Sequence, residues 1–217
     1  MEYILIFSIL TLLNCEWNGI DVSELQGPDI DFDKVKAEGK NFVILRAGIG
    51  TSIDKYFESN YKKAKAAGMN VGVYWYAEAL TEKDINNEAQ LCLKAISDKK
   101  LEYPIFYNIE QHEILVKGKT FCSNTAINFC SIMEVNKKFC GIISSKKYLD
   151  AYFNDKVKTY YSIWVAQHNS KCSYRQTYWM WQKSSKGKVN GINGNVCLDV
   201  SYRDFPSIIK RAHLNGY

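Results

Sequence analysis

The feature that most constrains the fold of this chain is a fivefold alternation of strand-like and helix-like segments. Most of the strand-like segments are short, largely apolar runs, and each strand-like segment is followed by one with helical character. The predicted strands cover residues 19–23, 42–47, 70–77, 104–110 and 139–145, and the predicted helices cover 32–39, 57–67, 82–97, 123–137 and 146–153. Five consecutive β/α units require right-handed crossovers and a parallel sheet or barrel.

The alternation stops in the last third of the chain. Residues 160–167, 178–183 and 196–200 are strand-like, but the connections between them are rich in Gly, Asn, Ser and Lys and show no helix. A parallel crossover usually needs a dozen or more residues with a helix, so we expect hairpin-like joins here. A terminal helix is predicted over 205–214. The sequence therefore predicts an α/β fold, a modified TIM-like barrel of five β/α units followed by three strands that lack intervening helices.

The first fifteen residues form a separate segment. Ile4–Leu13 is an almost unbroken apolar run that is too short to cross a bilayer. Such a run is typical of a secretory signal peptide, with Cys15 as the small residue at the cleavage site. A buried first strand or helix, and a lipid-modified Cys15, are the alternatives. We expect a leader over residues 1–15 and a single domain over 16–217, because no linker or repeat divides the rest.

The cysteines bear on the compartment in which the protein works. Removal of the leader would leave six of the seven cysteines, and an even number in a secreted chain suggests disulfides. A chain of 217 residues buries a core large enough to fold without them. No group of cysteines and histidines has the spacing of a zinc site, so we expect neither a metal nor another cofactor.

Carboxylates stand at the carboxyl ends of three predicted strands, where parallel barrels gather their functional groups. They are Asp21, Glu110 and Asp199. Asn108 shares a strand face with Glu110 because the two are two residues apart. Desolvation at the mouth of an apolar strand raises the pKa of a carboxyl group, as a general acid near neutral pH requires. The alternatives are a salt-bridged Glu110, a turn or capping role for Asp21, and a surface-loop position for Asp199.

Aromatic side chains gather near the same strand ends. Among them are Tyr74, Tyr76, Tyr107 and Trp164. Aromatic rings beside carboxylates suit a sugar polymer, because the rings stack on the apolar faces of sugars. The alternative for several of these rings is that they fill the barrel interior.

Other classes of function find little support in the sequence. The chain has three histidines, and it lacks a nucleophile elbow, a phosphate-binding loop, a dinucleotide fingerprint and a zinc-protease motif. Its net charge of +5 comes without a basic run, so no nucleic-acid partner is expected. The excess positive charge suits contact with an anionic surface such as a bacterial wall.

Six segments carry a resemblance to a known family. In chain order they are GIDVSELQ, FVILRAGIG, AGMNVGVYWY, PIFYNIE, SIWVAQH and WQKSSKGKVNGINGNVCLDVSY. Together they resemble glycoside hydrolase family 25, the Chalaropsis-type lysozymes or N-acetylmuramidases, over nearly the whole chain after the leader. The resemblance implies a barrel of five β/α units and three further strands. It also implies cleavage of the β-1,4 bond between N-acetylmuramic acid and N-acetylglucosamine in peptidoglycan.

Residue by residue, the resemblance implies that Glu110 is the proton donor of an Asp-x-Glu motif and that Asp21 is the first-strand aspartate of the site. The family is thought to use the substrate's 2-acetamido group as nucleophile, oriented by the aspartate of that motif. This chain has Asn108 there, which can orient the group but carries no charge. It also has Cys197 where the family pattern, GNVDLN, has an aspartate. A catalytically weakened barrel that binds glycans is therefore the alternative function.

The resemblance thus implies a secreted muramidase with Glu110, Asn108 and Asp21 as catalytic residues. The residues expected to bind substrate are Tyr74, Tyr76, Tyr107, Trp164, Gln182 and Asp199. The expected partner is bacterial peptidoglycan, with no nucleic acid and no membrane once the leader is removed. We expect a monomer that is secreted or held in a lumenal digestive compartment. Cys197 is either paired, with Cys172 as a candidate partner, or free beside the catalytic glutamate.

Overall fold

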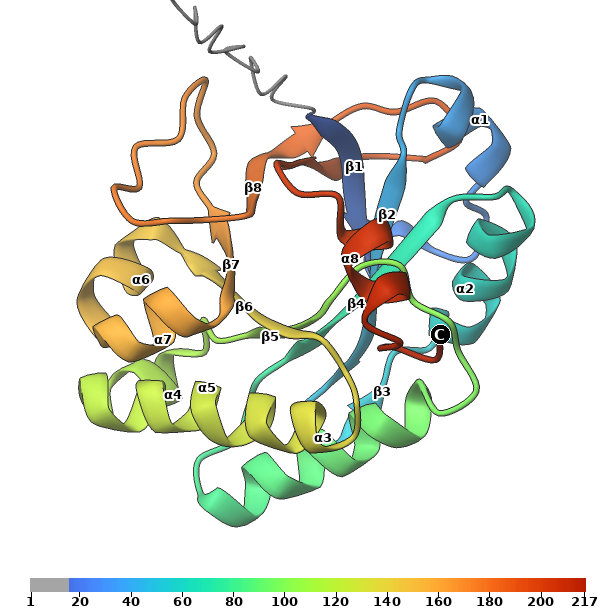
Figure 1. Cartoon of the computed structure of the whole chain (residues 1–217). Coiled ribbons are helices and arrows are strands. Elements are labelled where there is room, and N and C mark those ends of the chain that lie inside the picture. The colour runs from blue at the N-terminus through green and yellow to red at the C-terminus, as the bar shows by residue number, and fades with distance from the viewer. Residues whose placement is uncertain (1–15) are drawn as a thin grey trace, which may run out of the picture.

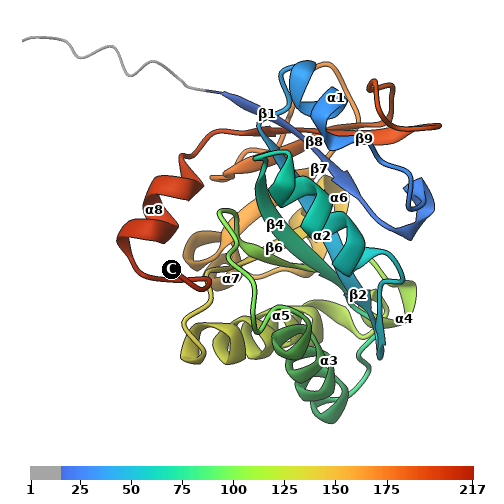
Figure 2. The same ribbon diagram turned by 90° about the vertical axis from the view of Figure 1, so that its right-hand side faces the viewer.

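The computed structural model describes residues 16–217, and the predicted leader lies outside the described residues. Eight strands close into a barrel (Figures 1 and 2). They are β1 (Trp17–Val22), β2 (Phe42–Ile49), β4 (Asn70–Tyr76), β5 (Ile105–Asn108), β6 (Cys140–Ser145), β7 (Ser162–Ala166), β8 (Met180–Gly187) and β9 (Val196–Ser201). β1 pairs in parallel with β2 and antiparallel with β9, which closes the ring. A short strand, β3 (Ser52–Ile53), adds to β2.

Helices follow the first five barrel strands, so the prediction of five β/α units is confirmed. The helices that match predicted segments are α1 (Phe32–Ala37), α2 (Phe57–Ala66), α3 (Glu82–Ala95), α5 (Gly118–Val135), α6 (Lys146–Tyr152) and the terminal α8 (Phe205–Arg211). The structure adds a 3-10 turn, η1 (Glu24–Gln26), and two short helices, α4 (His112–Leu115) and α7 (Asp155–Tyr160). These additions are too short to show helical periodicity in the sequence.

The prediction of hairpin-like joins among the last three strands is wrong for one of the two joins. β7 and β8 pair in parallel, with Trp164 opposite Met180 and Ala166 opposite Gln182. The loop between them is drawn in orange in Figure 1. It is long enough to bring the chain back to the amino ends of the parallel strands without a helix. β8 and β9 are antiparallel, as predicted. The parallel direction of β8 brings Gln182 level with the last residue of β7.

Alternation along the strands sorts the side chains into two layers. Outward-facing residues such as Val73 pack with the surrounding helices in one large apolar cluster. Inward-facing residues such as Phe106 form a second cluster inside the barrel. Nearer the carboxyl ends of the strands, buried polar groups replace the apolar ones: Asp21, Asn108, Gln182 and Asp199. The barrel is therefore apolar toward one end and polar toward the other.

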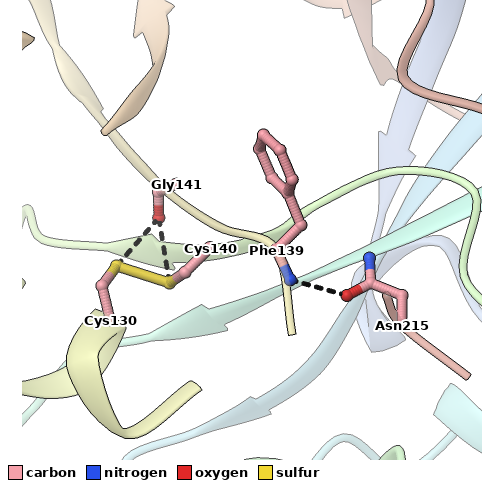
Figure 3. Close-up of a disulfide and its surroundings, with 5 residues drawn as sticks. All are labelled: Cys130, Phe139, Cys140, Gly141 and Asn215. Atoms are coloured by element: carbon pink, nitrogen blue, oxygen red, sulfur yellow. Dashed lines mark hydrogen bonds between the residues drawn. A yellow bond between two sulfur atoms is a disulfide. The ribbon is translucent and has the colours of Figure 1, made fainter. Parts of the chain in front are cut away.

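The C-terminal segment seals the apolar end. Phe205 of α8 joins the cluster inside the barrel, and its ring lies 5.3 Å from that of Tyr103. Asn215 is fully buried, donates to the Tyr103 carbonyl at 3.0 Å, and accepts the Phe139 N–H at 2.8 Å (Figure 3). Because these contacts close the amino ends of the strands, the opposite end is left for a functional site.

One disulfide joins the described cysteines. It links Cys130 of α5 to Cys140 at the start of β6, close to the sealed end of the barrel (Figure 3). The expectation of a disulfide is met by this pair. Within residues 16–217 the free cysteines are Cys92, Cys122, Cys172 and Cys197. The possible pairing of Cys172 with Cys197 is therefore wrong, and Cys197 carries a free thiol.

A buried acid ties α3 to the barrel. Glu88 is 2% exposed and accepts hydrogen bonds from the Tyr107 hydroxyl at 2.7 Å and from the Glu78 N–H at 2.9 Å. The first contact reaches β5, and the second reaches the segment that leaves β4. Burial raises the pKa of Glu88 to about 7. The carboxyl group is thus fixed in place where it holds a proton more readily than it does in water.

We expect this group to make stability fall as the pH rises through 7. Because the pKa of Glu88 is raised in the folded state, its contribution to the free energy of unfolding is complete at a pH below its ordinary pKa of 4.5. That contribution is lost once the pH exceeds about 7. The loss is on the order of 3 kcal/mol at most. Urea unfolding at pH 5 and pH 8 should show a smaller decline for Glu88→Gln than for the parent. Equal declines in the two proteins would contradict this role.

Candidate active site

Asp21 lies inside the barrel at the polar end of β1. It is 7% exposed, and its Oδ2 accepts a hydrogen bond from Gln182 Nε2 at 2.6 Å. The turn or capping alternative is wrong, because Ser23 is the residue that caps the following 3-10 turn, through its contact with Leu25 N. Burial raises the pKa of Asp21 to about 6, although the hydrogen bond from Gln182 works against the increase. Asp21 is therefore a carboxyl group held in a fixed position within the lumen.

Asn108 and Glu110 stand at the end of β5. Asn108 is the last residue of the strand, pairs with Tyr76 on β4, and is 7% exposed. Its buried Oδ1 has no hydrogen-bond partner among residues 16–217. A buried amide oxygen without a donor is uncommon, because it gives up its hydrogen bond to water without a replacement. Asn108 is thus left with an acceptor that a bound ligand can satisfy.

Glu110 follows the strand by two residues and is partly buried. It forms no ion pair within the described part of the chain, so the salt-bridge alternative is wrong. Burial raises the pKa of Glu110, and the Asp21 carboxyl adds to the increase, whereas the Ser145 backbone and His168 oppose it. The carboxyl group therefore combines access to solvent with a greater tendency to keep its proton.

β9 brings a further acid and a thiol to the same end of the barrel. Asp199 lies opposite Gln182, is 1% exposed, and accepts the Trp164 Nε1–H at 3.1 Å. The surface-loop alternative for Asp199 is therefore wrong. Cys197 lies opposite Asp21 and within hydrogen-bonding reach of its carboxyl group. Burial and the neighbouring carboxylates raise the pKa of Cys197, so this side chain is a neutral thiol at physiological pH.

His168 belongs to the site, although sequence reasoning did not select it. Its Nε2 lies 2.8 Å from Gln182 Oε1, and its Nδ1 lies 3.3 Å from the Ser185 hydroxyl. The contact at Oε1 leaves the amide nitrogen of Gln182 to face Asp21. The available signal was its position directly after a predicted strand. His168 thus fixes the orientation of a residue that hydrogen-bonds to the acid.

Of the four aromatic residues that were expected to bind substrate, two lie at the site and two do not. Tyr76 is partly buried, and its pKa is raised by burial and by the nearby Glu110 carboxyl, so the ring lies at the site. Tyr74 is also partly buried and faces the lumen, edge-on to Trp164 with ring centroids 6.5 Å apart. These two tyrosines line the polar end of the barrel.

The expectation is wrong for Tyr107 and Trp164. Tyr107 is fully buried outside the barrel, where it hydrogen-bonds Glu88 and stacks on Phe129 with centroids 3.8 Å apart. Its neighbour Asn108 faces the lumen, and adjacent strand residues face opposite ways. Trp164 is fully buried in the inner cluster below Asp199. Both rings support the site from within the protein and are not open to a ligand.

Two further findings concern the described residues only. Among them, no group of three or more His, Cys, Asp or Glu side chains is arranged to hold a metal ion. Within the same range, the helices are too short or too polar to cross a membrane.

A sequence model of the glycosyl hydrolases family 25 matches residues 20–192, a span that includes the second half of β1, all of β5 and most of the strands around the site. This chain belongs to family 25. The match starts one residue before Asp21 and runs through Asn108, Glu110 and Gln182. The resemblance read from the sequence segments is thereby confirmed.

Individual relatives in family 25 agree with this placement. The chain is 30% identical over 187 residues to an autolytic lysozyme of Clostridium acetobutylicum. This alignment covers 83% of this chain and 54% of the relative. This chain therefore spans about half the length of that curated relative. A modular autolysin of Streptococcus pneumoniae, LytC, solved with a synthetic peptidoglycan ligand, superposes with a TM-score of 0.79 at 24% identity, over 85% of this chain and 46% of LytC.

A second solved structure matches nearly end to end. It is a family 25 glycosyl hydrolase from Bacillus anthracis, with a TM-score of 0.76 and 21% identity, and the alignment covers 89% of this chain and 92% of that one. At this level of identity the comparison establishes the fold. Family 25 membership thus rests on the sequence match, and the barrel architecture rests on both.

Proposed function

We propose that this chain is a muramidase that hydrolyses the β-1,4 bond between N-acetylmuramic acid and N-acetylglucosamine in peptidoglycan. The observation that carries the proposal is the pair at the end of β5. There, a partly buried Glu110 with a raised pKa stands two residues from an Asn108 amide without a protein partner. Family 25 membership and the lysozyme and autolysin relatives support the choice of substrate.

In the proposed reaction Glu110 is the general acid. It gives its proton to the oxygen that links the two sugars as the bond to the anomeric carbon breaks. A raised pKa suits this step, because the carboxyl group must still hold its proton near neutral pH. After the first step the resulting carboxylate can take a proton from the water that completes hydrolysis.

Asn108 is proposed to orient the substrate's 2-acetamido group. The carbonyl oxygen of that group attacks the anomeric carbon from within the sugar, and the free Oδ1 of Asn108 accepts the N–H of the group. Positive charge develops on the acetamido group during this attack. Asn108 offers a dipole to this charge, whereas a carboxylate would offer a full negative charge. Asp21 is the proposed electrostatic support for the same charge.

A specific observation favours a second candidate function. Asn108 and Cys197 are neutral where the family pattern has aspartates, and the pKa of the Cys197 thiol is raised. A barrel with this composition could bind glycan chains through Tyr74 and Tyr76 while turning them over slowly or not at all. This candidate shares the site and the ligand with the first and differs only in the chemical step.

The place of action is also a proposal. We propose that residues 1–15 are a signal peptide and that the protein acts as a monomer outside the cell or in a lumenal digestive compartment. Peptidoglycan lies outside the bacterial membrane, and the apolar run Ile4–Leu13 is typical of a secretory leader.

The products of digestion distinguish the two candidates. Purified peptidoglycan is incubated with the protein, and the new reducing ends are converted with borohydride and identified after acid hydrolysis. We expect reduced muramic acid to accumulate with time. Reduced glucosamine would assign a different bond. Protein that sediments with the insoluble wall but releases no new reducing ends would favour the binding module.

A further inference from the structure

Two acids meet inside the barrel where the first and last strands pair. In the antiparallel pairing of β1 with β9, Gly19 lies opposite Asp199 and Asp21 lies opposite Cys197. Asp21 and Asp199 both point into the lumen from neighbouring strands, and their carboxyl groups lie within hydrogen-bonding reach of each other. The two side chains are 7% and 1% exposed. Both carboxyl groups are therefore removed from water and face each other.

The available donors do not satisfy both groups. Gln182 Nε2 donates to Asp21 Oδ2, and Trp164 Nε1 donates to Asp199 Oδ1. Of the two remaining oxygens, Asp199 Oδ2 is buried and has no hydrogen-bond partner among residues 16–217. An ionised carboxylate only accepts hydrogen bonds, so two such groups cannot bond to each other. The contact becomes a hydrogen bond when one of them carries a proton.

We infer that Asp21 and Asp199 hold one proton between them, and that Asp199 is a positioning residue whose O–H donates to the Asp21 carboxylate. Gln182 and Trp164 fix the outer oxygens, so the proton lies between the two inner ones. The pair then carries a single negative charge, and Asp21 receives donors from two sides. The shared proton depends only on the side chains of this protein, whereas its effect on turnover rests on the proposed function.

A difference between this chain and the family pattern on β9 is related to this arrangement. Where the family pattern reads DLN, this chain reads CLD, so the carboxyl group sits two residues further along the same face of β9. The Cys197 thiol occupies the position closer to Asp21 in the strand register. Asp199 thus donates the shared proton from a position deeper in the barrel. Asp21 carries the negative charge that faces the substrate.

Electrostatics agree with the geometry. Burial raises the pKa of Asp199 well above its ordinary value, and the neighbouring Asp21 raises it further. The other titratable or charged groups near the pair are Lys40, Tyr74, Glu110, His168, Lys183 and Cys197, and Arg46 lies near Tyr74. His168 and the Cys197 hydrogen bond lower the pKa of Asp21, and Lys183 lowers that of Asp199, so these three groups favour ionisation of the pair. The Asp21 carboxyl raises the pKa of Glu110, so these two acids disfavour each other's ionisation.

Infrared difference spectra test the shared proton without reference to activity. Parent minus Asp199→Asn at pH 8, where most of Glu88 is ionised, should show the carbonyl stretch of a protonated carboxylic acid. Parent minus Asp21→Asn should show the same band, since an amide at position 21 donates to an ionised Asp199. The band should be retained in Glu110→Gln. Its absence from both aspartate differences would overturn the inference.

Unfolding measurements provide a second test. A raised pKa in the folded state gives stability that is complete at low pH and is lost as the pH rises. We expect the parent to lose more stability than Asp199→Asn between pH 5 and pH 9. The contribution of Glu88 is common to both proteins and cancels in the comparison. Parallel declines would count against the pair.

Turnover shows whether Asp199 positions Asp21. Asp199→Ala removes the donor and is expected to lower kcat about tenfold across the pH range. Asp199→Asn restores a donor, so it should recover most of that loss and should move the alkaline limb of the pH profile. If Asn rescued nothing while the infrared band was present, the positioning role would be wrong and the shared proton would stand. If the parent had no activity, the spectra and the unfolding data would still decide the shared proton.

Discussion

Replacing Glu110 with Gln is expected to reduce the rate of peptidoglycan hydrolysis by about a thousandfold, the range of a lost general acid. The amide keeps the size of the side chain but has no proton to give to the leaving oxygen. The folded structure should be unaffected, because Glu110 forms no ion pair with the described residues and is only partly buried. The rate of appearance of new reducing ends provides the measurement.

Glu113→Gln is the matched control. Glu113 is exposed on α4, three residues beyond Glu110, and forms no ion pair in the described chain. Its replacement changes the net charge by the same amount and should leave kcat close to that of the parent. Sedimentation with insoluble wall material should be similar for both variants. A Glu110→Gln protein that lysed walls as fast as the parent would remove Glu110 from the role of acid.

Asn108→Asp is expected to raise kcat by about a hundredfold, because it places a full negative charge beside the acetamido group as positive charge develops there. The buried Oδ1 of Asn108 has no protein partner, so the new carboxylate would face the ligand directly. The second charge would also raise the pKa of Glu110 further, since like charges disfavour ionisation. The alkaline limb of the pH profile should therefore move upward along with the increase in kcat.

Two comparisons make this result specific. Asn87→Asp introduces the same charge on the exposed face of α3 and should change nothing. Asn108→Ala removes the acceptor and should lower kcat. If Asn108→Asp left kcat unchanged, then the missing charge at this position does not limit the reaction. If the parent released no products and Asn108→Asp did, then the parent is a binding module on a scaffold that is still able to support the chemistry.

Local patterns were sufficient to predict the first five β/α units. β2 begins as a continuous apolar run that is covered on both sides. Some helices also carry boundary signals, as with the Thr81 side chain that accepts the Asp84 N–H at the start of α3. The parallel pairing of β7 with β8 was missed because no local signal distinguishes a long crossover loop from a hairpin. The placement of Tyr107 could have been read from strand alternation, since its neighbour Asn108 was already assigned to the same strand face as Glu110.

The candidate site was harder to predict because it depends on distant contacts. Asp21, Glu110 and Gln182 were selected from the sequence, and the structure places them at one end of the barrel. The contact between Asp21 and Asp199 exists only because the ring closes between β1 and β9. His168 was missed for a similar reason, since its partner Gln182 lies across a long irregular loop.

Closure of the ring by the two ends of the chain also affects when the lumen becomes complete. A nascent chain that has been translated only as far as Glu110 already carries the proposed acid, yet it lacks the strands that supply Gln182 and Asp199. Contacts of such large sequence separation form late, after the entropy cost of closing the longest loop has been met. A truncated product without β9 therefore lacks Asp199 and the strand that closes the ring, and we expect it to show no turnover of glycan.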